Sequence, residues 1–134
     1  MAEHPNVQRI RDTYAAFAAG DLSSALKDLA PAGVFHFRGT GPLSGRRMGV
    51  EHIKAALVGA HRLTAGTRRF DITDIYADDH HGVVVMRERA SRHDGATLDI
   101  EEVHIIAFDG EGRISDLWDL PSDPEAHNRF FDGE

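Results

Sequence analysis

Histidines placed between apolar residues are the first groups in this chain that could do chemistry. His36 lies between Phe35 and Phe37 in a stretch that has the composition of a buried strand. His104 interrupts the apolar alternate positions of residues 97–108. Imidazole titrates near neutral pH and can serve as an acid or a base. Both histidines are therefore candidates for proton transfer.

Two glutamates interrupt apolar stripes in the same way. Glu88 shares an alternating face with Met86, and Glu102 shares one with His104. A three-residue loop at 94–96 would keep the apolar faces together, and it predicts that Glu88 pairs with Glu102. In that register Met86 pairs with His104. Opposed carboxylates repel unless they share a proton, a cation or a protonated histidine, so the pairing indicates a polar site.

The last hairpin leaves two orientations open. A four-residue loop at 109–112 pairs His104 with Leu117 and places Asp119 on the inner face with Trp118 outside. Apolar counting favours the reverse, because the more apolar alternating set is Ile114, Trp118 and Leu120.

The elements that must position these groups are helices early in the chain and strands late. A first helix begins at Pro5 and ends near Gly20, with Tyr14 and Phe17 on its apolar stripe. Asp21 can cap a second helix. The remaining expected elements are a strand at 34–38, a helix at about 50–62, strands at 70–76, 82–92, 97–108 and 113–120, and a last helical turn or two after Pro124. This order predicts an α+β domain with helices on one face of a curved sheet.

Composition limits the classes of function. The 134 residues are the length of one domain, 1–134, and they include no cysteine for disulfides or thiolate chemistry. The net charge of −7, without a basic run longer than two residues, argues against nucleic-acid binding. No segment approaches the roughly 20 apolar residues of a membrane span. We expect a cytoplasmic protein without a membrane partner.

Three segments resemble a known family: VQRIRDTYAAFAAGDLSSALKDLAPAGVFHFRG, PLSGRRMGVEHIKAAL and VHIIAFDGEGRISDLWD. Over nearly the whole chain they resemble the SnoaL-like branch of the nuclear transport factor 2-like superfamily. The resemblance implies a cone-shaped α+β barrel, in which N-terminal helices pack on a strongly curved, mixed, mainly antiparallel sheet. It also implies a pocket in the mouth of the cone and a homodimer.

The same resemblance implies site residues. In ketosteroid isomerases of this superfamily the position of the carboxylate base falls on His36, and that of the oxyanion-stabilising acid falls on His104. Tyr14 is displaced by one position from their helix-one tyrosine. In SnoaL-like cyclases the proposed proton-transfer acid matches Asp119. Epoxide hydrolases of the superfamily use an Asp-Arg-Asp arrangement, which the outward-facing Arg87 and Arg89 do not support.

Two hypotheses follow from these residues. The first is an isomerase, cyclase or lyase acting on a polyketide-like carbonyl compound without an organic cofactor, in which His36 abstracts a proton. His104, aided by Glu102 or Tyr14, would then stabilise the enolate. Asp119 is a further proton-transfer candidate, and the expected substrate-binding residues are Phe17, Met86, Glu88, Leu117 and Trp118. The second hypothesis is a non-catalytic ligand-binding or dimerisation module. We expect no metal, because His36, His104 and Glu102 have no recognised ligand spacing.

Overall fold

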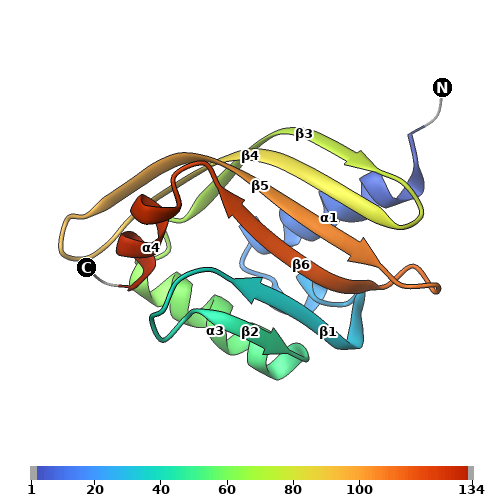
Figure 1. Cartoon of the computed structure of the whole chain (residues 1–134), viewed down its shortest axis with the longest axis horizontal. Coiled ribbons are helices and arrows are strands. Elements are labelled where there is room, and N and C mark those ends of the chain that lie inside the picture. Colours follow the sequence, from blue (N-terminus) through green and yellow to red (C-terminus); the bar gives the residue numbers. More distant parts are fainter. Residues whose placement is uncertain (1–2, 133–134) are drawn as a thin grey trace.

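The fold is a six-stranded curved sheet with helices against one face, which we call the inner face (Figure 1). The structure is a computed structural model, and it describes residues 3–132. The strand order is β2-β1-β6-β5-β4-β3. All neighbouring strands are antiparallel except β1 and β6, which are parallel. The elements are α1 (Pro5–Ala18), α2 (Leu22–Ala25), β1 (Leu29–Phe37), β2 (Gly45–Met48), α3 (Val50–Leu63), β3 (Arg69–Ala77), β4 (His81–Ser91), β5 (Thr97–Phe108), β6 (Ile114–Pro121) and α4 (Pro124–Asp132).

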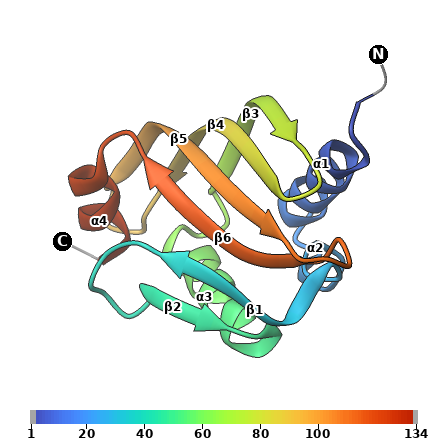
Figure 2. The same cartoon turned by 45° about the vertical axis from the view of Figure 1, so that its right-hand side comes forward.

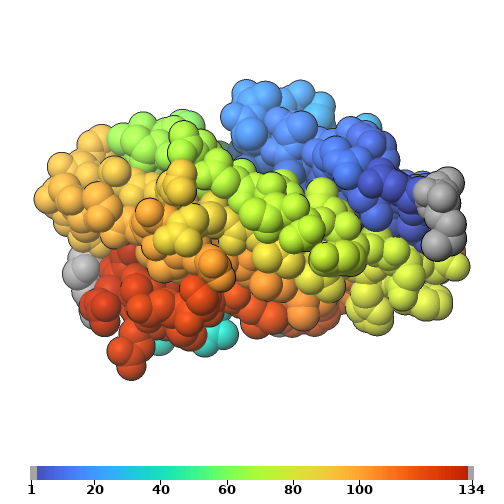
Figure 3. All heavy atoms as spheres, turned by 90° about the horizontal axis from the view of Figure 1, so that it is seen from above, coloured from blue at the N-terminus to red at the C-terminus, as the bar shows by residue number. Residues whose placement is uncertain are grey.

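The two long helices cover different parts of the inner face, and α4 lies at one end of the sheet (Figure 2). Helix α1 lies beside β3, as the view from above also shows (Figure 3). The close approach of α1 to β4 depends on Gly82, where an added Cβ would lie 2.5 Å from Ile10 Cδ1. The main core lies between these layers and includes Ile10, Leu26, Phe35, Ile53, Leu57, Val84, Met86 and Ile106. The expected α+β fold, with helices on a curved sheet, is therefore confirmed.

Four elements differ in extent from the sequence prediction, and one of them is β1, which begins at Leu29 and not at residue 34. Helix α2 is a single turn, because the chain soon enters β1, where Leu29 pairs with Ile114 of β6. Strand β2 was expected to be loop, since its residues GRRM have no apolar alternation and it lies at an edge of the sheet. Helix α4 extends through nine residues because its apolar face packs beneath the sheet.

The β4–β5 hairpin corrects the predicted pairing but keeps the predicted faces. Glu102 pairs with Met86, and Glu88 pairs with Ile100, two residues away from the expected register. The turn is closed by Arg92 and Ala96, and the Asp94 carboxylate accepts hydrogen bonds from both. A shift of two residues preserves alternation. Glu88 and Glu102 therefore remain on the same inner face as diagonal neighbours.

The β5–β6 hairpin settles the orientation of the last strand. Asp119 pairs with His104 and is buried on the inner face. Trp118 pairs with Ile105 on the outer face. Of the two orientations left open by the sequence, the structure has Asp119 inward and Trp118 outward, and the pairing of His104 with Leu117 expected for a four-residue loop is wrong. Phe108 pairs with Ile114, so the loop is one residue longer than expected, and a register shift between Ala107 and Phe108 adds the second residue of the difference.

Helix α4 is tied to the loop that joins β1 and β2. The Asp132 carboxylate accepts hydrogen bonds from the backbone N–H groups of Thr40 (3.1 Å) and Gly41 (2.9 Å) and from Ser44 Oγ (3.2 Å). An added Cβ at Gly41 would lie 2.6 Å from Asp132 Oδ1. This contact holds the C-terminal end of α4 against the sheet, and α4 brings one further histidine to the inner face.

Candidate functional site

A mainly apolar cavity lies between α1 and the inner face of the sheet, and we call it the chamber. It encloses about 60 Å³. A wider hollow of about 350 Å³ adjoins it near the ends of α1 and α3, and the two share Phe17, Leu57 and Arg68 in their walls. The chamber's walls include Tyr14, Phe17, Leu26, Phe35, Phe37, Leu57, Arg68, Phe70, His104, Ile106, Leu117 and Asp119. A few polar groups in an aromatic wall are typical of small-molecule sites.

Tyr14, His104 and Glu102 form a chain of polar groups that ends at the chamber. The Tyr14 hydroxyl lies 2.5 Å from His104 Nδ1, and His104 Nε2 lies 3.3 Å from Glu102 Oε2. A carboxylate only accepts, so the imidazole proton belongs on Nε2, and the Tyr14 hydroxyl then donates to Nδ1. The helix stripe and the alternation of β5 bring these groups together as the sequence predicts.

Arg68 lies just before β3 and enters the chamber wall from a position that the sequence analysis did not single out. Its Nε lies 3.1 Å from Glu88 Oε2, with the arginine side chain only 14% exposed. Its guanidinium carbon lies 4.8 Å from the centre of the Phe70 ring and 5.0 Å from that of Phe131. Together with a more distant contact to the Phe17 ring, these cation–π contacts fix the guanidinium beside the buried carboxylate.

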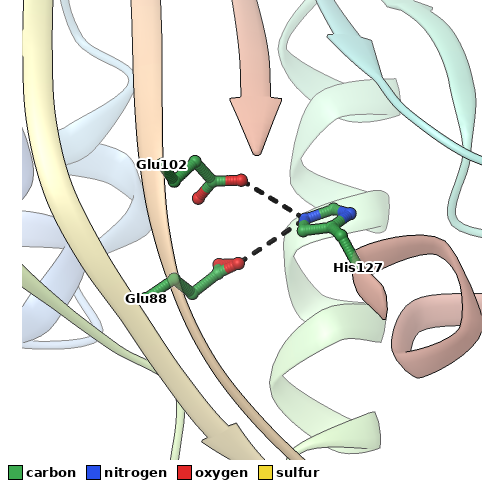
Figure 4. A group of neighbouring side chains, drawn as sticks. All are labelled: Glu88, Glu102 and His127. Atoms are coloured by element: carbon green, nitrogen blue, oxygen red, sulfur yellow. Dashed lines mark ion pairs between the residues drawn. The ribbon is translucent and has the colours of Figure 1, made fainter. Parts of the chain in front are cut away.

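His127 is the second residue that the sequence analysis missed. Figure 4 shows its ring facing Glu88 of β4 and Glu102 of β5. Its Nε2 lies 3.5 Å from Glu88 Oε1, 3.4 Å from Glu102 Oε1 and 3.7 Å from Asp119 Oδ2. A signal was present in the sequence, because His127 precedes Phe130 and Phe131 at helical spacing. That spacing places His127 on the buried stripe of α4.

Burial and neighbouring charge shift three pKa values in this region. Burial, reinforced by the charge of Glu102, raises the pKa of Tyr14, so its hydroxyl stays protonated. Burial alone would raise the pKa of Glu88, but Arg68 and His127 outweigh it and hold that pKa low. Burial would lower the pKa of His127, but its carboxylate neighbours, Glu88 first, outweigh burial and raise that pKa.

His36 and Trp118 do not reach the chamber, contrary to expectation. Phe35 and Phe37 line the chamber, so alternation directs His36 to the outer face. There its ring stacks on Trp118 with centroids 4.9 Å apart, and its Nε2 donates to Asp116 Oδ1 at 3.0 Å. The resemblance to ketosteroid isomerases placed His36 at the position of their carboxylate base and therefore in the pocket. The inward-facing phenylalanines on either side of it indicate the outer face instead.

The other expected residues divide between the chamber and its surroundings. Phe17 and Leu117 line the chamber together with Tyr14, His104 and Asp119. Met86 is a fully buried core residue, and Glu88 belongs to the charged cluster behind the wall.

Residues 10–117 match the SnoaL-like domain family. The chain belongs to this family. A relative, the uncharacterized protein Rv0034 of Mycobacterium tuberculosis, is 32% identical over 98% of this chain and 99% of its own length. Two solved structures share the fold. Bal32a, from a soil-derived mobile gene cassette, is 26% identical with a TM-score of 0.86, over 94% of this chain and 95% of its own. A nuclear transport factor 2-like protein of unknown function from Burkholderia pseudomallei is 23% identical with a TM-score of 0.84, over 94% and 96%.

The SnoaL-like fold hosts different activities, so the family sets the scaffold and the site residues must carry any functional argument. Within residues 3–132, no helix is both long enough and apolar enough to cross a bilayer.

Proposed function

We propose that this SnoaL-like protein is an enzyme that moves a proton at the carbon beside a carbonyl group, as an isomerase, cyclase or lyase without an organic cofactor. The observation that carries the proposal is the direct pairing of His104 and Asp119 on the wall of an apolar chamber. Directly opposed side chains have Cβ atoms about 5 Å apart. The pairing therefore places the Asp119 carboxylate, as the base, close to the Tyr14 hydroxyl that His104 holds, as the donor, so that both can act on one small substrate.

Asp119 takes the role of the base in place of His36. It is 8% exposed and lines the chamber. Its Oδ1 has no hydrogen-bond partner within residues 3–132, so a lone pair is available to accept a proton. His36, on the outer face, cannot reach a ligand in the chamber.

Tyr14 supplies the hydrogen bond to the enolate oxygen. Its hydroxyl stays protonated because its pKa is raised, and its acceptor without a ligand is His104 Nδ1. An enolate oxygen is a stronger acceptor than a neutral imidazole nitrogen, so the hydroxyl turns toward it as charge develops. His104, facing Glu102 through its other nitrogen, positions the hydroxyl.

The chamber walls select a compact, mainly apolar carbonyl compound. Phe17, Phe70 and Phe35 supply flat apolar surface, and the charged side chains of the lining include Arg9, Asp28 and Arg68. The chamber and the adjoining hollow together have room for a ring compound of modest size. A polyketide-like ketone or 1,3-diketone has the acidic carbon that this chemistry needs.

Hydrogen–deuterium exchange tests the proposal without knowledge of the natural substrate. A panel of cyclic ketones and aromatic 1,3-diketones is incubated with protein in D₂O, and loss of the α-proton signal is followed by NMR. We expect the protein to accelerate exchange of at least one compound. Asp119→Asn should slow that exchange by ~100-fold or more, as expected when a general base is lost.

His36→Gln is the matched control, because it removes a histidine from the outer face and leaves the chamber unchanged. It should exchange at the unmodified protein's rate. Equal loss in both variants, or an active Asp119→Asn variant, would contradict the assigned roles.

The alternative is a ligand-binding module without chemistry, and one observation favours it. Tyr14 and His104 satisfy each other in the chamber, which is also the arrangement of a passive polar wall. A compound that shifts chamber resonances in NMR spectra but shows no accelerated exchange would support this second function.

A further inference from the structure

We propose that Glu88, Glu102 and His127 bind a divalent transition-metal ion of the Zn²⁺ or Mn²⁺ class behind the chamber. The three come from β4, β5 and α4 and converge on one point (Figure 4). One donor atom from each lies within 4.8 Å of the other two. The glutamate side chains are 0% exposed and that of His127 is 4% exposed, so all three donors are buried.

The distances suit a metal better than an ion pair. Charge-assisted hydrogen bonds from nitrogen to carboxylate oxygen are about 2.7–2.9 Å long. His127 Nε2 lies 3.5 Å from Glu88 Oε1 and 3.4 Å from Glu102 Oε1. Ligands at ~2.1 Å from a metal in tetrahedral geometry lie about 3.4 Å from one another.

Among residues 3–132, Glu88 has one oxygen without a hydrogen-bond partner and Glu102 has two, so each can offer an oxygen to such an ion. Arg68 holds Glu88 Oε2, and His104 faces Glu102 Oε2. The remaining oxygens, both Oε1 atoms, point at His127. In the part of the chain that the structure describes, neither Oε1 atom nor His127 Nε2 has a hydrogen-bond partner. Arg68 and His104, which contact the second oxygen of each glutamate, resemble the outer-shell groups that orient metal ligands.

The net charge of the buried cluster also favours a divalent cation. Asp119 adds a third carboxylate, with Oδ2 3.7 Å from His127 Nε2. Three carboxylates against the Arg68 guanidinium leave two negative charges in a buried region when both histidines are neutral. Buried uncompensated charge is strongly unfavourable. One divalent ion balances these charges, whereas a protonated His127 balances only one of them.

The donor set limits which ion fits. Imidazole with carboxylates suits first-row transition ions, whereas Mg²⁺ prefers oxygen ligands and retained waters. His127 and Asp119 also line a small hollow beside Phe37 and Leu43. An ion would therefore have a side from which water or a ligand could reach it.

Calorimetric titration of tag-free full-length protein, first dialysed against a chelator, tests the site. We expect one equivalent of Zn²⁺ or Mn²⁺ to bind and Mg²⁺ to bind far more weakly. His127→Gln and Glu88→Gln should each weaken the binding by at least ~10-fold, since even the loss of an outer-shell partner costs that much. A double variant, His80→Gln with His81→Gln, removes exposed histidines and should bind as the unmodified protein does.

Anomalous scattering from zinc-soaked crystals of the unmodified protein gives a readout that does not depend on the variants folding. A peak between Glu88, Glu102 and His127 is expected. No binding of either ion, binding unchanged in His127→Gln, or a peak only at surface histidines would overturn the proposal. The hydrogen–deuterium exchange assay tests the proposed proton transfer, and the metal-binding measurements test the metal site. Either proposal can therefore fail while the other stands.

Discussion

The Tyr14 hydroxyl can donate its single proton to either of two acceptors, a side chain of the protein or a bound ligand. It donates to His104 Nδ1, and a ligand oxyanion in the chamber would compete for the same proton. The Phe70 and Tyr14 rings form a T-shaped pair with centroids 6.0 Å apart, which holds the phenol in place. The Tyr14 hydroxyl therefore contributes both to the stability of the fold and to the proposed chemistry.

Tyr14→Phe should affect both properties. Removal of a buried donor leaves His104 Nδ1 unpaired, so we expect a loss of about 1–3 kcal/mol in the free energy of unfolding, measured by urea denaturation. For a compound active in the exchange assay, the rate should fall by ~10-fold or more. Tyr76→Phe is the matched control, because Tyr76 is 61% exposed, and it should change neither quantity. An unchanged exchange rate in Tyr14→Phe would remove the tyrosine from the mechanism.

At the scale of elements, α4 determines whether the charged cluster exists. It begins at Pro124, carries His127 inward on a stripe with Phe130 and Phe131, and ends at the Asp132 carboxylate. That carboxylate binds the backbone of the β1–β2 loop at Thr40 and Gly41. Loss of the contact between Asp132 and the β1–β2 loop should therefore weaken the packing of α4, the helix that carries His127.

Asp132→Ala should destabilise the protein by about 1–2 kcal/mol at pH 7, from the loss of two or three hydrogen bonds. Hydrogen bonds from Thr40 and Gly41 outweigh the effect of burial and lower the pKa of Asp132. A carboxyl with a lowered folded pKa stabilises above its unfolded pKa, about 3.9, and loses that contribution as pH falls through the folded value. The difference between unmodified protein and variant should therefore be full at pH 7 and shrink below about pH 4.

Urea denaturation at pH 7, 4 and 3 measures this difference. Asp132→Asn keeps one acceptor oxygen and no titratable group, so its smaller loss should not depend on ionisation at this position. A difference between Asp132→Ala and unmodified protein that stays constant across the three pH values would show that the carboxylate charge is not involved.

At the scale of the whole molecule, the outer face of the sheet is apolar along its middle strands. Ile105 pairs with Trp118, and Val103 pairs with Leu120, which is 41% exposed. No helix covers this side in the described part of the chain (Figures 1 and 2). Contiguous apolar surface rimmed by charge is typical of an association site, and a two-fold dimer is the commonest closed arrangement.

We expect a homodimer that forms through this face. Ile105→Glu should yield a monomer in sedimentation velocity, because a carboxylate would be buried without a partner. Gln8→Glu adds the same charge to an exposed position of α1 and should remain dimeric. A monomeric unmodified protein at micromolar concentration would refute the expectation.

Local pattern determined much of this molecule before any tertiary contact was known. Apolar spacing predicts α1 and α3, and period-two alternation places Glu88, Glu102 and His104 on the inner face. These signals are local because a strand or helix shows its buried side within a few residues. The hairpin registers needed the turns themselves, since Asp94 and the irregularity near Phe108 set which residues lie opposite each other.

The composition of the site was decided only by the fold. His36, flanked by two phenylalanines that face inward, turns to the outer face and stacks on Trp118. Arg68 and His127 join the glutamates from a loop and a C-terminal helix, where no sequence spacing connects them to β4 and β5. Periodicity specifies which side of an element is buried. Only the packing of distant elements specifies which buried groups meet, because that depends on how the sheet curves and where each helix crosses it.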